Sequence, residues 1–145
     1  MLLVLDTSVL FMALYSSKGA SYRILKLIRD GSVQLALSIP TFSEYQEVLL
    51  RANTLDILKL RQFEVEELLD GLAHLAFPFD IHYLMRPNLR DEADNMFVDL
   101  AFASSCDCIV TSNMRDFTND NDLRFDGFRI LTPKQFILEW EGLND

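Results

Sequence analysis

Apolar residues recur along this chain in two patterns, short continuous runs and longer segments with helical periodicity. Five short runs are apolar almost without interruption, a pattern typical of strands that are covered on both faces of a sheet. These runs are residues 2–5 (LLVL), 33–37 (VQLAL), 79–83 (FDIHY), 108–111 (CIVT) and 128–131 (FRIL). The longer segments between them place apolar residues every three or four positions, which predicts helices.

The predicted helices alternate with the predicted strands. They cover residues 20–31, 40–52, 62–77, 93–105 and 132–140. Gly31 suits the position after a helix C-terminus, and Pro40 suits a first helical turn. Strands that alternate with helices imply right-handed crossovers. We therefore expect an α/β fold, a three-layer α/β/α sandwich with a mostly parallel, Rossmann-like sheet of about five strands.

Length and composition are those of one folded domain. The 145 residues are 50% hydrophobic and contain no Gly, Pro or Ser tract, so we expect a single domain over residues 1–145. The N-terminal apolar run ends within five residues and has no basic region before it. It is therefore interpreted as neither a signal peptide nor a membrane span, and a cytoplasmic location is expected.

The two cysteines, Cys106 and Cys108, lie one residue apart on a predicted strand. This spacing is too tight for the usual zinc or redox motifs, so we interpret them as reduced thiols in the core.

The formal net charge of −9 argues against a general polyanion binder, because affinity for a phosphate backbone comes mainly from Lys and Arg. This argument against nucleic-acid binding is weaker if the acidic residues are clustered at a cation site. Two divalent ions would bring the charge to −9 + 4 = −5.

Acidic residues recur just after predicted strands or early in the helices that follow them. In a parallel sheet, ligands bind beyond the carboxyl ends of the strands, where a polar group can be exposed in a crevice. The acids concerned are Asp6 in VLDTSVL, Glu44 in IPTFSEYQEVL, the group Asp91, Glu92 and Asp94 in LRDEADNMF, and Asp116 in TSNMRDF. We expect these four places to meet at one edge of the sheet.

Carboxylates that meet in one place raise each other's pKa values unless a cation neutralises them. Hard oxygen ligands suit Mg²⁺ or Mn²⁺. One such ion, or a pair about 3.5 to 4 Å apart, can activate water and stabilise the leaving oxygen of a phosphodiester. The pattern therefore indicates metal-assisted phosphodiester hydrolysis. Neither His74 nor His82 falls in a motif, so a histidine general base is not predicted.

Each acid also has a structural interpretation. Asp6 could cap the following helix, and Thr41 with Glu44 fits a capping box. Asp91 and Asp94 could be first-turn acids that the helix dipole favours. These alternatives stay open at the level of the sequence.

Other acids are set apart from the group. Asp99 follows Asp94 by five residues, a rotation of about 140° along a helix, and is expected to face elsewhere. The loop with Asp120, Asp122 and Asp126 lacks the closing Glu of a calcium-binding loop and is interpreted as solvated.

With these residues in place, the chain resembles the PIN domain family (PilT N-terminal nucleases), in particular its VapC-like toxin ribonucleases. The resemblance covers nearly the whole chain. VLDTSVL matches the first strand and Asp of the family, SIPTFSEYQEVL the helix with the second acid, and FRILTPKQFI the closing strand and helix. RPNLRDEADNMFVDLAFASSCDCIVTSN is the most specific segment. Many relatives carry Asp where this chain has Asn113, and some have Asn there with Asp three residues later, as at Asp116.

The resemblance implies a ribonuclease that uses one or two Mg²⁺ or Mn²⁺ ions. Its catalytic residues would be Asp6, Glu44, Asp94 and Asp116, and its metal ligands Asp6, Asp94, Asp91 and Asn113. Thr7, Ser8, Thr111 and Ser112 would orient carboxylates, waters or phosphate oxygens. The family also implies an RNA substrate, a frequent homodimer, and a cognate antitoxin that covers the acidic pocket.

Two other functions are alternatives. A PIN-fold module that binds metal or protein without turnover is consistent with the −9 charge and with Asn113. A receiver-like phosphoacceptor domain would need an acid pair after the first strand and an Asp after the third, where this chain has LDTS and IHYLMR.

Overall fold

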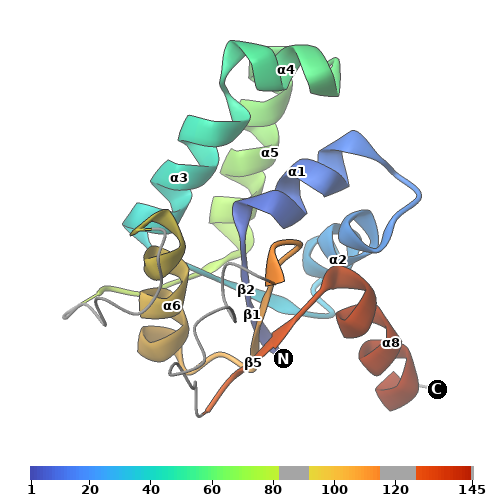
Figure 1. Ribbon diagram of the computed structural model, residues 1–145, viewed down its shortest axis with the longest axis vertical. Helices are drawn as coiled ribbons and strands as arrows, with labels where there is room; N and C mark the ends of the chain where they lie inside the picture. Colours follow the sequence, from blue (N-terminus) through green and yellow to red (C-terminus); the bar gives the residue numbers. More distant parts are fainter. Residues whose placement is uncertain (82–91, 115–126, 145) are drawn as a thin grey trace.

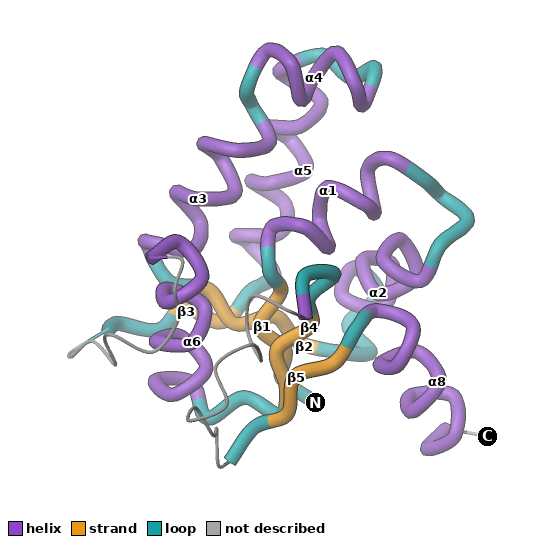
Figure 2. Tube along the Cα trace, in the orientation of Figure 1, coloured by secondary structure: helices purple, strands orange, loops and turns teal. Residues whose placement is uncertain are grey.

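A parallel sheet forms the centre of the fold (Figures 1 and 2). The computed structural model describes residues 1–81, 92–114 and 127–144, with only the backbone of 92–95 and 144. Within these ranges, five strands pair in the order β3-β2-β1-β4-β5, and each recorded pair is parallel. They are β1 (Leu2–Leu5), β2 (Gln34–Leu37), β3 (Phe77–Pro78), β4 (Cys108–Val110) and β5 (Arg129–Leu131). The predicted α/β fold with a mostly parallel sheet of about five strands is confirmed.

Helices connect the strands and cover the sheet. They are α1 (Thr7–Tyr15), α2 (Ala20–Arg29), α3 (Ile39–Leu49), α4 (Ala52–Leu58), α5 (Gln62–Leu75), α6 (Glu92–Ser104) and α8 (Pro133–Asn144). The sequence analysis did not delimit α1 and α4, because the first is apolar on most of its circumference and the second has only seven residues. In the described ranges, none of the helices combines the length and apolar character needed to cross a membrane.

The third strand is the one that the sequence analysis misplaced. The run at 79–83 predicted a strand, whereas the structure has the two-residue β3 at Phe77–Pro78, and residues 79–81 lie outside any strand. Pro78 has no N–H to donate, so it is tolerated because β3 is at the edge of the sheet. Apolar alternation alone did not reveal this short edge pairing. Residues 82 and 83 of that prediction lie outside the described residues.

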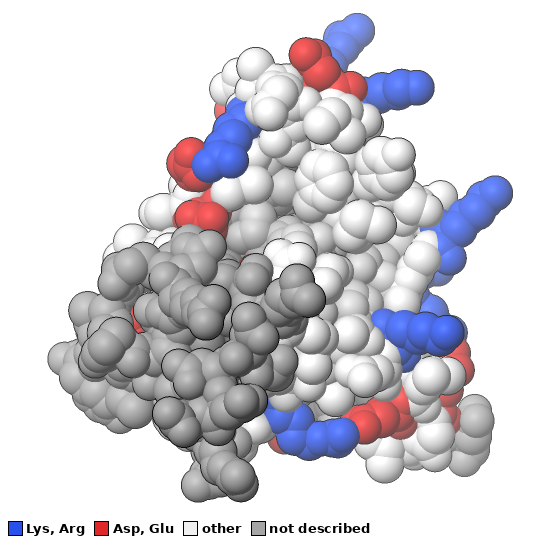
Figure 3. Space-filling model, viewed as in Figure 1, with Lys and Arg blue, Asp and Glu red and all other residues white. Residues whose placement is uncertain are grey.

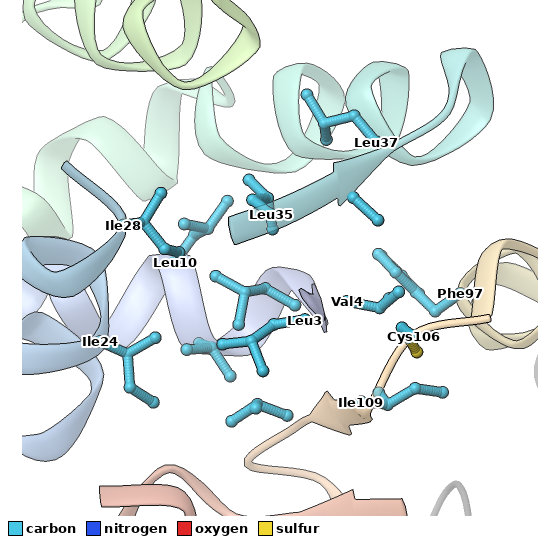
Figure 4. Close-up of a cluster of buried hydrophobic side chains, with 14 of the residues drawn as sticks. Leu3, Val4, Leu10, Ile24, Ile28, Leu35, Leu37, Phe97, Cys106 and Ile109 are labelled. Atoms are coloured by element: carbon cyan, nitrogen blue, oxygen red, sulfur yellow. The ribbon is translucent and has the colours of Figure 1, made fainter. Parts of the chain in front are cut away.

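The core lies on both faces of the central strands. On one side, Leu3 and Leu35 face Leu10 of α1 and Ile24 of α2 (Figure 4). On the other side, Val4 faces α6, which contacts β1, β2 and β4. Successive residues of a strand point to opposite faces, so a continuous apolar run serves both layers. Figure 1 shows α6 on one side of the sheet and α2 and α8 on the other, as expected for the predicted three-layer sandwich.

The strand order creates a break in the winding direction next to β1. The chain moves from β1 outward through β2 to β3 and then returns to place β4 on the other side of β1. The crevice beyond the carboxyl ends of strands at such a switch point is the usual ligand site of open α/β sheets. In this protein the switch point lies between the ends of β1 and β4, which Leu5 and Val110 share as paired residues.

Candidate functional site

Asp6 stands at the switch point, immediately after β1 and at the N-cap position of α1. Its side chain is buried, with 4% of the residue exposed. Its Oδ2 accepts one hydrogen bond from Ser8 Oγ at 2.6 Å and another from Thr111 Oγ1 at 2.8 Å. The sequence analysis expected an acid exposed in a crevice, and this expectation is wrong. The carboxylate is buried and hydrogen-bonded.

The two hydroxyls are themselves fixed by backbone amides. Ser8 Oγ accepts a hydrogen bond from the Ser112 N–H at 3.1 Å, and Thr111 Oγ1 accepts one from the Asn113 N–H at 2.9 Å. Because each hydroxyl already accepts from an amide, its own proton is directed to the carboxylate. Asp6, Ser8 and Thr111, here called the Asp6 clamp, thus join the end of β1 to the residues that follow β4.

Burial raises the pKa of Asp6 above its usual value, and this is the largest effect on it. The hydrogen bonds from Ser8 and Thr111 act in the opposite direction, as do the backbone amides of Thr7 and Ser8. Neither amide has the geometry of a cap hydrogen bond, so Asp6 occupies the N-cap position without capping through its side chain. A cation at this carboxylate would favour its charged form.

The second acid, Glu44, lies on α3 and is half-buried. The start of α3 is fixed by a capping box between Ser38 and Thr41, in which the Ser38 side chain accepts from the Thr41 N–H. Ser38 directly follows β2, so α3 starts at the same edge of the sheet as Asp6. The alternative of a Thr41–Glu44 capping box is wrong, because the helix begins three residues earlier than that motif requires.

Tyr45, the residue after Glu44, is a site residue that sequence reasoning missed. Its hydroxyl donates a hydrogen bond of 2.5 Å to the carbonyl oxygen of Leu5, and 1% of the residue is exposed. Its ring stacks on Phe97 of α6 with a centroid distance of 6.1 Å. Burial, and after it the negative charge of Asp6, raise the pKa of Tyr45 so far that the phenol stays protonated and a donor. The available signal was a tyrosine next to a predicted catalytic acid.

The structure brings some of the predicted site residues together. Asp6, Ser8, Thr111 and the backbone of Ser112 and Asn113 form one hydrogen-bonded group. Thr7 directly follows Asp6 as the first residue of α1, and its Oγ1 is buried without a hydrogen-bond partner among the described residues.

The remaining predicted ligands are not tested. Asp94 is described only by its backbone in α6, and Asp91 and Asp116 lie outside the described residues, as do His82, Asp120, Asp122 and Asp126. Among the side chains that the structure does describe, no three His, Cys, Asp or Glu residues gather in a metal-binding group. The metal set therefore stays a prediction.

Asp99 is a second buried acid that the sequence analysis set aside. It is 4% exposed on α6, the helix that contacts β1, β2 and β4. The acid in the apolar run MFVDLAFA was the signal for such a position. Whether Asp99 faces away from Asp94, as expected, stays a prediction because the side chain of Asp94 is not described.

Both cysteines are buried and unpaired, which confirms their interpretation as core thiols. Burial raises the pKa of Cys106 to about 11 and that of Cys108 to about 12. The thiols therefore stay protonated near neutral pH.

Comparison with known proteins shows the family and the fold of the chain. A family model described as PIN domain matches residues 2–115, so the chain belongs to the PIN domain family. A search of curated proteins gave no match.

Among solved structures, the chain is similar in fold to a crystal structure of VapBC2 from Rickettsia felis. In that structure VapBC2 is bound to a DNA fragment from its promoter. The TM-score is 0.62 at 15% identity, and the match covers 91% of this chain and 98% of the other. It is also similar to DNA-bound VapBC from Salmonella typhimurium. Here the TM-score is 0.61 at 16% identity, with 92% and 99% of the two chains covered. The fold is thus VapC-like.

Proposed function

We propose that this protein is a divalent-metal-dependent endoribonuclease, the toxin component of a toxin–antitoxin pair. The observation that carries the proposal is the Asp6 clamp at the switch point of a PIN-domain sheet. A buried carboxylate held by two hydroxyls at the usual ligand site of an open α/β sheet is more than a helix cap needs. The Asp6 side chain accepts no cap hydrogen bond from the backbone of α1, which supports the same view.

The residues at the site fit a hard cation. Within the described part of the chain, both side-chain hydrogen bonds to Asp6 go to Oδ2, and the adjacent Thr7 Oγ1 is a buried oxygen without a hydrogen-bond partner. Carboxylate oxygens suit Mg²⁺ or Mn²⁺. We propose Asp6, Asp94, Asp91 and Asn113 as the residues that hold one or two such ions. A bound ion would supply Lewis acidity and a water of lowered pKa.

Residues of the chain would supply the other catalytic groups and hold them in position. Glu44 and Asp116, with Asp6 and Asp94, complete the proposed catalytic set. Ser8 and Thr111 hold Asp6 in one orientation, and the Ser112 and Asn113 amides hold the two hydroxyls. Thr7 and Ser112 are proposed to contact waters or phosphate oxygens of the RNA.

The test is cleavage of RNA by the purified protein with Mg²⁺ or Mn²⁺, compared with Asp6→Asn. Asparagine keeps the shape of the side chain and an acceptor for the clamp but loses the charge. We expect a loss of more than about 100-fold, since the loss of an outer-shell partner alone typically costs 10–100-fold. Asp70→Asn, which removes the same charge from an exposed position on α5, is the matched control. Equal rates for the wild type and Asp6→Asn would refute the proposal.

The proposed partners are a cognate antitoxin and a second copy of the chain. The proposal of an antitoxin is supported by the VapC-like fold. The carboxylates of the proposed site would also attract an arginine side chain of such a partner. The homodimer rests on the family resemblance alone and is checked by light scattering. If the wild type binds Mn²⁺ but cleaves no RNA, the protein is instead a PIN-fold binding module.

A further inference from the structure

Tyr45 lies where the elements that carry three of the predicted acids meet. Its hydroxyl is bonded to the carbonyl oxygen of Leu5, the residue that precedes Asp6. It follows Glu44 directly on α3. Its ring stacks on Phe97, which comes three residues after Asp94 on α6.

The bond to Leu5 has a structural reason in the sheet. The recorded pairing of β1 with β2 covers Leu2 and Leu3, whereas the pairing with β4 extends to Leu5. On the β2 side, the end of β1 thus runs past its recorded partners. Tyr45 reaches from α3 to the Leu5 carbonyl at this point and supplies a donor from a helix.

We propose that Tyr45 is a positioning residue that fixes Asp6, a proposed cation ligand, relative to Glu44 on α3 and thereby sets the geometry of the candidate site. The inference rests on the proposed function and adds a residue to the same site. The phenol is buried and its hydroxyl donates to the Leu5 backbone, so its role is positional and not catalytic. It acts through the backbone of Leu5 and through the adjacent turn of α3.

Rigidity is the reason for expecting an effect. The tyrosine is 1% exposed and cannot exchange its partner for bulk water. The ring is held between two helices, because α3 and α6 pack against each other and Tyr45 and Phe97 stack at 6.1 Å. A hydroxyl fixed in this way transmits the position of α3 to the end of β1.

The test is Tyr45→Phe, which keeps the ring and its stacking on Phe97 but removes the donor. We expect cooperative unfolding to persist, the Mn²⁺ dissociation constant from titration calorimetry to rise about tenfold, and RNA cleavage to fall with it. Tyr22→Phe removes a hydroxyl from a half-buried ring on α2 and is the control that should bind Mn²⁺ like the wild type. A purely structural role would lower the melting temperature and leave the Mn²⁺ affinity of the folded protein unchanged.

A crystal structure of Tyr45→Phe without metal gives a second readout. Compared with the wild type, we expect the Asp6 and Glu44 carboxylates to be shifted relative to each other by more than about 0.5 Å.

The possible outcomes separate this inference from the proposed function. Wild-type Mn²⁺ affinity in Tyr45→Phe overturns the inference and leaves the proposed function standing. If the wild type binds Mn²⁺ without cleaving RNA, the proposed function fails, and the Mn²⁺ affinities still decide the role of Tyr45. If the wild type binds no Mn²⁺, the proposed function fails, and an unchanged carboxylate separation overturns the inference as well.

Discussion

A buried carboxylate is costly unless hydrogen bonds or a cation stabilise its charge. Asp6 has the hydrogen bonds, from Ser8 and Thr111, and yet burial still raises its pKa. The protein thus keeps at the end of β1 a group whose charge the described residues only partly compensate. Hydrogen bonding within the described residues does not fully account for it, whereas the proposed cation would compensate the remaining charge.

Thr111 tests the clamp most cleanly, because it is fully buried and has an isosteric replacement. Thr111→Val removes a hydrogen bond to a carboxylate and the acceptor for the Asn113 N–H. We expect a loss of about 1–3 kcal/mol in the free energy of unfolding, measured with urea at neutral pH. The Mn²⁺ affinity should fall by about 10–100-fold.

Thr54→Val is the matched control for this change, since Thr54 is a buried threonine on α4. It should leave Mn²⁺ binding as in the wild type. If Thr111→Val also binds Mn²⁺ normally, the clamp does not orient Asp6.

At the scale of elements, helix ends decide where side chains are presented. The Ser38–Thr41 capping box starts α3 directly after β2 and places Glu44 in its second turn. Gly31 follows the C-cap of α2 with a φ of +84°, the left-handed conformation that the predicted helix end requires. The predictions from Gly31 and Pro40 were confirmed because such signals depend only on local backbone geometry.

Two glycines give opposite predictions for the same substitution. Gly31→Ala should destabilise the protein by about 1–2 kcal/mol, because alanine resists a positive φ. Gly71 lies inside α5 with no atom near the position of a Cβ, so Gly71→Ala should stabilise it by about 0.8–1.0 kcal/mol. Both values are measured as free energies of unfolding in urea. Changes of the same sign would contradict the helix end assigned to α2.

For the whole molecule, the distribution of basic side chains bears on how RNA would be attracted. On the face in Figure 3, the described Lys and Arg side chains stand around the margin, and much of the described surface between them is uncharged. With a net charge of −9, RNA would be attracted only weakly by the described part of this face. A bound cation would then contribute both to chemistry and to attraction.

The pH dependence of stability should report the burial of Asp6. Because its pKa is raised on folding, its protonated form favours the folded state. That contribution is present below the unfolded value, near pH 4, and is lost as the pH rises through the raised pKa. In EDTA, Asp6→Asn should therefore be more thermostable than the wild type at pH 7, and the difference should shrink as the pH falls towards 4.

Melting temperatures in a series of buffers measure this difference. Saturating Mn²⁺ at pH 7 should raise the melting temperature of the wild type more than that of Asp6→Asn, because the variant lacks one of the proposed carboxylate ligands. A difference between the two proteins that stays constant with pH would show that burial of Asp6 does not perturb its titration.

The sequence by itself determined the fold class and the elements with strong signals. Four of the five predicted strands and the α2, α3, α5, α6 and α8 helices were found, because continuous apolar runs and helical periodicity report burial directly. The family resemblance also placed Ser8 and Thr111 among four hydroxyl residues expected to orient carboxylates, waters or phosphate oxygens, without assigning them to Asp6. The sequence placed the third strand wrongly, because pairing at a sheet edge depends on the neighbouring strand more than on local pattern.

Only the tertiary structure decided how the site is held. Nothing local to Asp6 indicates that Thr111, 105 residues away, shares its Oδ2 with Ser8, and nothing local to Tyr45 indicates a bond to Leu5. Those contacts arise because the strand order places β4 and β2 on either side of β1, and α3 starts directly after β2. Local sequence specifies which residues are apolar or polar, whereas partners far apart in the chain are fixed by the packing of whole elements.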